Sequence, residues 1–132
     1  MCCIRDILLI DSYEDNNNKI GRHSFVVIDD QNGEICGMPY DFIANVLSSF
    51  KSKKQMKRKL SYPGNFEISH DDTKTHPHNL KDGYIKTEQL YYFNKEKISY
   101  TVIGTMNEDA FNNLLNFIEN SDASIIDITD NL

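Results

Sequence analysis

Short apolar segments alternate with polar breaks along the first third of the chain, which is the pattern of a β-rich domain. Segments rich in β-branched, aromatic and other apolar residues predict strands at residues 4–11, 23–30 and 34–42. The polar stretch 12–22, with three consecutive Asn, predicts a loop between strands. Asn32-Gly33 predicts a tight hairpin turn, because both residues accept the positive φ angles that such turns require.

The middle of the chain combines a helical spacing with a strongly basic stretch. Apolar residues recur at i, i+3, i+4 and i+7 in Ile43, Val46, Leu47 and Phe50, which predicts a helix. The basic residues that follow, 51–59, include good helix formers but few apolar anchors, so they predict a short helix or a mobile loop. We therefore expect residues 43–62 to form a basic helix or arm inserted into the domain.

The second half of the chain predicts further strands and one helix. Strands are expected at 65–69, 84–93 and 98–106, with a loop at 70–83, where no apolar period is present. Asn107 suits an N-cap, Glu108 and Asp109 suit a first turn, and apolar spacing predicts a helix over 108–119. The acidic tail, 121–132, is expected to fray or to add an edge strand.

This order of elements predicts one α+β domain that is mainly β. Several short strands followed by a terminal helix are typical of a small antiparallel barrel or sheet with one face covered. The barrel domain is expected over residues 1–120, with 121–132 as a tail. A half-open barrel of this size often dimerises to bury its remaining apolar surface, so a homodimer is expected.

Composition and charge narrow the function classes. Hydrophobic residues make up 39% and charged residues 26%, which is typical of a globular chain. No apolar run approaches the ~20 residues of a membrane span, no secretory signal is evident, and an odd number of cysteines favours reduced thiols. We therefore expect a cytoplasmic protein that does not contact membranes.

The net charge of −6 disfavours tight non-specific binding to nucleic acid, but the charge is uneven. Six of the fourteen Lys and Arg residues lie within 51–59. Basic residues beside aromatic ones suit single-stranded RNA, whose phosphates pair and whose bases stack. The candidates for RNA binding are Lys53, Lys54, Lys57, Arg58 and Tyr62; the alternative is a solvated helix face.

Two short segments carry candidate catalytic residues. At the start of the second strand, Arg22 can grip a phosphate and His23 can exchange a proton near neutral pH. On the late strand, Lys86 and Glu88 lie on one face and could form an acid–base pair with a phosphate-binding cation. Cleavage of a phosphodiester needs a base, an acid and a cation. The same residues are also typical of a solvated loop end and of an exposed ion pair.

A cluster of His and Asp in the 70–83 loop raises the question of a metal. His70-Asp71-Asp72, His76 and His78 supply ligand types, but a proline separates the last two histidines and the spacing matches no zinc pattern. We favour a polar surface loop and expect neither a metal nor another cofactor.

Taken in order, several stretches resemble the MazF/PemK family of toxin endoribonucleases from type II toxin–antitoxin systems. RDILLI stands where the family has a strand of the type GDIVLV, and RHSFVVI stands where it has RPVLVI. GYIKTEQ resembles the family's late strand, G-x-V-x-x-D-Q, and is followed by a strand ending in Ile-Gly and a helix with an acidic first turn. The resemblance covers roughly residues 4–119, and it rests on the order and spacing of individually weak motifs.

The resemblance implies a small SH3-like barrel with a C-terminal helix, usually a homodimer. It also implies cleavage of single-stranded RNA and inhibition by an antitoxin protein whose tail occupies the RNA groove. Without a metal, the RNA 2′-hydroxyl is the only nucleophile needed, so the expected product is a 2′,3′-cyclic phosphate. The alternative is a non-catalytic barrel that acts by binding RNA or, as related gyrase poisons do, a protein.

The family's functional positions map unevenly onto this chain. The key Arg before the second strand corresponds to His23 when the apolar residues are superposed without a gap, and Arg22 lies one place earlier. An Arg and an Asp of the PemK branch correspond to Lys86 and Glu88. The family's Thr or Ser after the third strand falls at Met38-Pro39-Tyr40, and Ser48 and Ser49 follow as possible substitutes.

Overall fold

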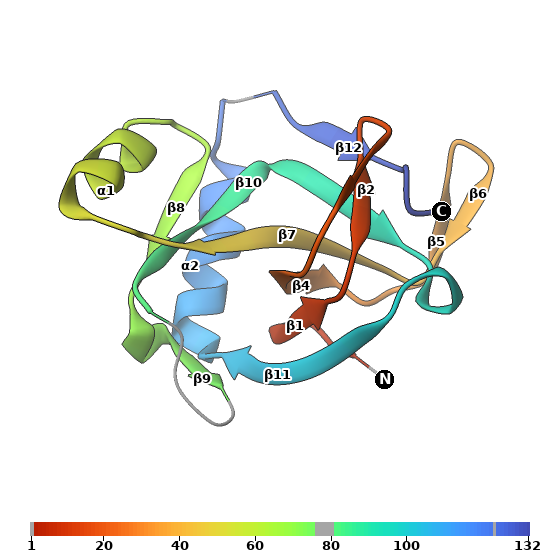
Figure 1. Cartoon of the computed structure of the whole chain (residues 1–132), viewed down its shortest axis with the longest axis horizontal. Helices are drawn as coiled ribbons and strands as arrows, with labels where there is room; N and C mark the ends of the chain where they lie inside the picture. The colour runs from red at the N-terminus through yellow and green to blue at the C-terminus, as the bar shows by residue number, and fades with distance from the viewer. Residues whose placement is uncertain (1, 76–80, 123) are drawn as a thin grey trace.

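The fold is built around one curled sheet, which two helices and two small hairpins accompany (Figure 1). The structure is a computed structural model that describes residues 2–75, 81–122 and 124–132. The main sheet has eight strands: β1 (Asp6–Ile10), β4 (His23–Asp29), β7 (Phe42–Ser49), β8 (Asn65–Ile68), β9 (Thr73–Thr75), β10 (Gly83–Phe93), β11 (Tyr100–Met106) and β12 (Ile126–Ile128).

The other elements lie at the ends and edges of this sheet. Two hairpins pair β2 (Tyr13–Asp15) with β3 (Asn18–Ile20) and β5 (Gly33–Ile35) with β6 (Met38–Tyr40). The helices are α1 (Lys53–Leu60) and α2 (Glu108–Glu119), and two short 3₁₀ turns are η1 (His70–Asp72) and η2 (Lys95–Lys97). Among the described residues, no helix is long and apolar enough to cross a membrane.

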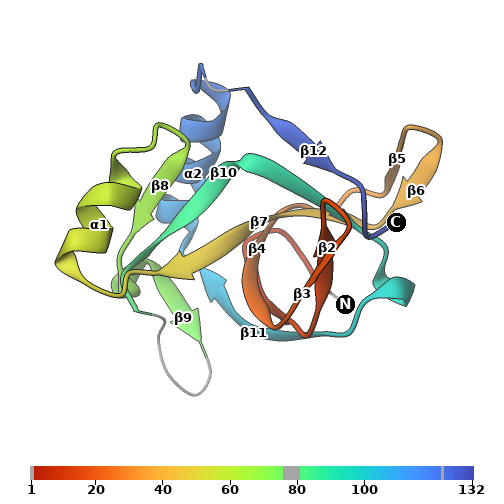
Figure 2. The same cartoon turned by 45° about the horizontal axis from the view of Figure 1, so that its top comes forward.

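The strands follow the order β12-β10-β7-β4-β1-β11-β9, and β8 pairs with the start of β10 on the edge opposite β7. All of these pairings are antiparallel except that of β12, which runs parallel to β10. The sheet curls into a half-barrel, so the expected mainly-β α+β fold with an antiparallel barrel and a late helix is confirmed. Strand β7 lies between β4 and β10 (Figure 2).

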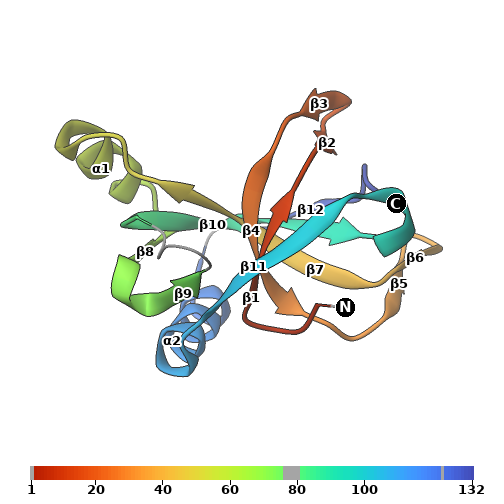
Figure 3. The ribbon, with the colours of Figure 1, turned by 60° about the horizontal axis from the view of Figure 1, so that its bottom comes forward.

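The sheet buries apolar side chains on both of its faces. One face holds an aromatic cluster that includes Tyr13, Phe25, Tyr91 and Phe93. The other face packs against α2 through residues such as Val26, which alternates with Phe25 along β4. In Figure 3, α2 lies on one side of the sheet and the β2–β3 hairpin on the other. The two faces therefore differ in what covers them. His23, Ser48 and Lys86 on the hairpin side stay partly exposed, and we call this side the open face.

Most of the expected elements are present. The predicted strands at 4–11, 23–30, 65–69, 84–93 and 98–106 correspond to β1, β4, β8, β10 and β11. The predicted helix over 108–119 has the bounds of α2. Of the two alternatives for the tail, the structure has the edge strand, β12. The helix branch of the prediction for 51–59 is also confirmed, since α1 spans Lys53–Leu60.

The helix predicted from Ile43 to Phe50 is wrong, because that segment is strand β7. Six consecutive residues from Phe42 to Leu47 are buried, so the segment faces apolar surroundings on both sides of the sheet. An apolar run interrupted only by Asn45 satisfies the helical period and the strand period together, and pairing with a strand on each side decides in favour of the strand. The inserted arm is therefore limited to α1 and its flanks.

The turns also differ from expectation. The tight turn expected at Asn32-Gly33 lies instead at Cys36-Gly37, where both residues have positive φ, and Gly33 begins β5. Thus the strand expected over 34–42 is a hairpin followed by the start of β7. The expected loop 12–22 contains the β2–β3 hairpin, which turns at Asn16 and Asn17, both again at positive φ.

A buried asparagine fixes a large bulge in β10. Val46 pairs with Lys86 and Ala44 with Tyr91, so the single residue Asn45 faces a longer stretch of β10. Asn45 is fully buried, and its Nδ2 donates to the carbonyl oxygens of Lys86, at 3.2 Å, and Gln89, at 2.9 Å. These two bonds satisfy carbonyl groups that the interrupted ladder leaves free, and they hold the backbone of Lys86 in place.

Candidate functional site

A row of side chains crosses the open face of the sheet where β4 and β7 meet. His23 pairs with Ile10 of β1, and Ser24 pairs with Leu47 of β7. One step further along the same strands, His23 lies opposite Ser48, and Ser48 in turn pairs with Tyr84 of β10. Directly opposed residues in antiparallel strands share a face, so His23, Ser48 and Tyr84 lie side by side.

His23 and Ser48 are joined by a hydrogen bond. The imidazole Nε2 lies 3.1 Å from the Ser48 Oγ, and the direction of donation depends on the tautomer of the ring. The ring also packs against two aromatic side chains, with centroid distances of 6.4 Å to Tyr13 and 6.3 Å to Phe25. These contacts hold the half-buried ring in one orientation with one edge toward Ser48.

The surroundings of His23 favour its neutral form. Burial lowers the pKa of His23, and the positive charge of Lys86 lowers it further. Lys86 lies on the same face as Tyr84, two residues further along β10, and pairs with Val46 across the strands. A neutral imidazole at neutral pH can accept a proton, while the nearby ammonium can stabilise negative charge.

Histidine titrations provide a direct test of this environment. We expect His23 to titrate below the ordinary value of ~6.5 and His70 above it, because the hydrogen bond that the His70 ring donates to Asp82 and the charge of Asp71 raise the pKa of His70. His23 then contributes its full share of stability above ~6.5, and that share is lost as the pH falls through its lowered pKa. NMR titration of the ring signals measures the pKa values of His23 and His70, and the Lys86→Gln variant shows how much Lys86 contributes to the pKa of His23. The variant should raise the pKa of His23; titration of His23 after His70 on raising the pH would contradict the assignment.

The contacts of Arg22 and Glu88 lie outside this row. Arg22 directly precedes β4, and its Nε lies 3.6 Å from Asp11, with 67% of the Arg22 side chain exposed. Glu88 lies over the backbone of Gly64, where an added Cβ would come within 2.1 Å of the Glu88 side chain. Among the described residues, Lys86 and Glu88 form no ion pair. The catalytic roles of Arg22 and Glu88 stay predictions.

The predicted RNA-binding residues lie on and just after α1, which extends beyond the sheet beside β8 and β10 (Figure 2). Lys59 of this helix places its Nζ 5.9 Å from the centre of the Tyr84 ring, and Tyr84 stacks on Phe50 with ring centres 5.3 Å apart. The helix has no acidic residue in its first turn. Exposed positions include Lys53, Lys54, Lys57, Arg58 and Tyr62. The basic helix thus adjoins the open face at Tyr84.

The histidine cluster considered for a metal is only partly described. His70 contacts Asp82 through Nδ1 at 2.9 Å and Asp71 through Nε2 at 3.3 Å. His76 and His78 lie outside the described residues. Within residues 2–75, 81–122 and 124–132, no group of three or more His, Cys, Asp or Glu side chains has the geometry of a metal site.

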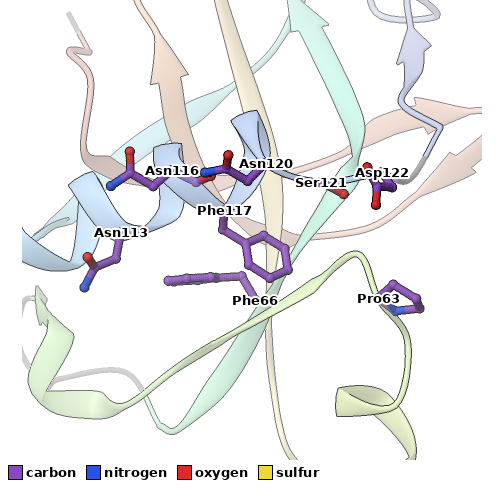
Figure 4. A pocket seen from close by; sticks show the side chains of 8 residues that line it. All are labelled: Pro63, Phe66, Asn113, Asn116, Phe117, Asn120, Ser121 and Asp122. Atoms are coloured by element: carbon purple, nitrogen blue, oxygen red, sulfur yellow. The ribbon is translucent and has the colours of Figure 1, made fainter.

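A hollow of about 670 Å³ lies on the other side of the sheet, against α2 (Figure 4). Its apolar part is the pair Phe66 and Phe117, whose ring centres are 5.2 Å apart. Side-chain amides of Asn113, Asn116 and Asn120 border it. None of the described residues that line the hollow is a predicted site residue or a cation that could complement a phosphate.

Sequence reasoning identified His23 and Lys86 but did not place Ser48 beside them. Ser48 was missed because residues 42–49 were not recognised as a strand, and only the strand register places Ser48 opposite His23. Phe50 and Tyr84 were also missed as site residues, because Phe50 was assigned to a predicted helix and Tyr84 occupies an unspecified position of the GYIKTEQ motif. Comparison of the sequence with models of known protein families and with curated proteins finds no match.

Proposed function

We propose that this chain is a metal-independent endoribonuclease of the MazF/PemK type that cleaves single-stranded RNA. The observation that carries the proposal is the hydrogen bond between His23 and Ser48, with Lys86 on the same open face. The sequence resemblance aligns His23 with the family's key Arg. Ser48 supplies, on β7, a hydroxyl of the kind that the family has after its third strand.

The proposed reaction uses the RNA's own 2′-hydroxyl as nucleophile. Neutral His23 accepts the proton from this hydroxyl as its oxygen bonds to the adjacent phosphorus. Lys86 stabilises the negative charge that gathers on the non-bridging oxygens. The bond from phosphorus to the 5′-oxygen breaks, and the imidazolium returns a proton to that oxygen. The products are a 2′,3′-cyclic phosphate and a 5′-hydroxyl.

Three other groups have supporting roles in this proposal. Ser48 holds the imidazole ring, and it is therefore a positioning residue. Arg22, at the mouth of the site beside Asp11, is suited to a flanking phosphate. The basic helix α1 guides the RNA strand, as the sequence predicted for Lys53, Lys54, Lys57, Arg58 and Tyr62. An antitoxin protein and a second copy of the chain remain the partners that the resemblance implies.

The test is cleavage of a long single-stranded RNA by the purified protein in the presence of EDTA. Discrete fragments ending in a 2′,3′-cyclic phosphate are expected, and mass spectrometry identifies that end. Removal of the 2′-hydroxyl at the mapped cut site should abolish cleavage there. Equal cleavage of the 2′-deoxy substrate would refute the mechanism, and intact RNA with folded protein would favour a non-catalytic binding module.

A further inference from the structure

A second pocket, of about 660 Å³, opens between α1 and the start of β10. Phe50 and Met56 provide its apolar part. Its remaining lining residues are polar or charged: Lys51, Ser52, Lys53, His70, Lys81 and Asp82. The pocket draws on three separate segments of the chain, which the fold brings together at one end of the sheet.

The charges that line this pocket are mainly positive. Lys51, Lys53 and Lys81 contribute three ammonium groups, and none of them forms an ion pair with a described residue. The one carboxylate, Asp82, already accepts hydrogen bonds from the backbone amide and Nδ1 of His70, at 2.8 and 2.9 Å. Three ammonium groups against one carboxylate therefore give the pocket an excess of positive charge, in a chain whose net charge is −6.

The pocket also adjoins the proposed cleavage site. Phe50 stacks on Tyr84 at an interplanar angle of 29°, and Tyr84 pairs across the strands with Ser48. The half-buried ring of Phe50 thus links the end of β7 beside Ser48 to the three lysines, while the Tyr84 ring stacked on it is only 3% exposed. Cations beside aromatic and apolar groups are the features that bind single-stranded nucleic acid, because phosphates pair with the former and bases contact the latter.

We propose that this pocket binds the phosphate of a nucleotide in the RNA strand, away from the bond that is cut. The proposal rests on the proposed function for its choice of RNA, but the pocket's affinity for phosphate does not depend on cleavage. It implies that the substrate is a strand long enough to reach from the His23–Ser48 pair to α1, and that short RNAs bind weakly.

Binding is best measured with the full chain carrying His23→Ala, so that the RNA stays intact. The probes are a mixed-sequence single-stranded RNA of ten nucleotides and inorganic phosphate. Addition of either should shift the backbone amide signals of Phe50, Ser52 and Asp82 in NMR spectra. Adding Lys53→Gln and Lys81→Gln should weaken RNA binding about tenfold and reduce the salt dependence by about 1.4 in the slope of log K against log salt, since two phosphate contacts are lost. Lys95→Gln with Lys97→Gln removes the same charge at η2 and should leave the affinity nearly unchanged.

The possible outcomes separate this proposal from the proposed function. If the two pairs of lysine substitutions weaken RNA binding equally, the RNA is attracted by overall charge, and the proposal that this pocket binds a phosphate is overturned. RNA binding without shifts at Phe50, Ser52 and Asp82 would also overturn it, even if the parent protein cleaves RNA. Phosphate binding at these amides with no RNA binding would support the anion site but overturn its assignment to an RNA strand. The proposed function is tested independently, since it fails only if the parent protein does not cleave RNA.

Discussion

Replacing His23 with alanine is expected to reduce RNA cleavage by about 10²–10⁴-fold, the usual contribution of a general acid–base group. The imidazole is the proton acceptor of the proposed reaction, and its neutral form is favoured by burial and by Lys86. Its ring is already oriented by Ser48, Tyr13 and Phe25. Initial rates on one RNA, in EDTA and at equal protein concentration, measure the effect.

Three further variants make this result specific. Ser48→Ala should cause a smaller loss, about tenfold or less, and should also shift the pH profile, because the serine acts through the ring. Asn112→Ala, on the exposed side of α2, should leave the rate unchanged and serves as the control. If Arg22→Ala abolishes cleavage and His23→Ala retains it, the general base has been assigned to the wrong residue, and Arg22 becomes the central group.

Replacing Phe25 with alanine is expected to lower the free energy of unfolding by about 3–5 kcal/mol. Phe25 is fully buried, and its ring centre lies 4.9 Å from Tyr13 and 5.3 Å from both Tyr91 and Phe93. Loss of the ring therefore removes apolar contacts and leaves a cavity at the centre of the aromatic cluster. Urea unfolding followed by circular dichroism measures the difference.

Tyr62→Ala is the matched control for this prediction. It removes an aromatic ring that is 52% exposed, so it should change the unfolding free energy by less than about 0.5 kcal/mol. A Phe25→Ala variant that loses less than about 1 kcal/mol would show that the surrounding rings close the cavity. The aromatic cluster would then be too deformable to hold the His23 ring rigidly, as the proposed site requires.

Local signals in the sequence determined which elements could be predicted. The bounds of α2 follow from an acidic first turn and an apolar spacing, both of which lie within the helix itself. β7 could not be recognised, because its apolar run suits two periods and only burial between β4 and β10 separates them. The turn at Cys36-Gly37 was missed because Asn32-Gly33 carries the stronger turn signal nearby.

In the candidate site too, features that depend on local sequence were predicted and features that depend on tertiary structure were not. His23 was identified because its chemistry suits proton transfer and because of its place in a motif. The nearness of Ser48 depends on the register of two strands, which no short pattern contains. The pocket beside α1 combines residues from three segments, so its positive charge emerges only once the chain is folded. Residue type is therefore predictable here, whereas the partners of each residue are not.

The sheet order has a consequence for how the protein acquires its structure during synthesis. Because β1 pairs with β11, the half-barrel cannot close until residues 100–106 have left the ribosome. Pairing of β4 with β7 needs far less chain, and the His23–Ser48 contact can form as soon as that hairpin-like unit exists. Contacts between such distant segments slow folding, typically to milliseconds or seconds. A nascent chain can thus bring His23 and Ser48 together before the barrel closes, whereas Lys86 joins them only once β10 pairs with β7.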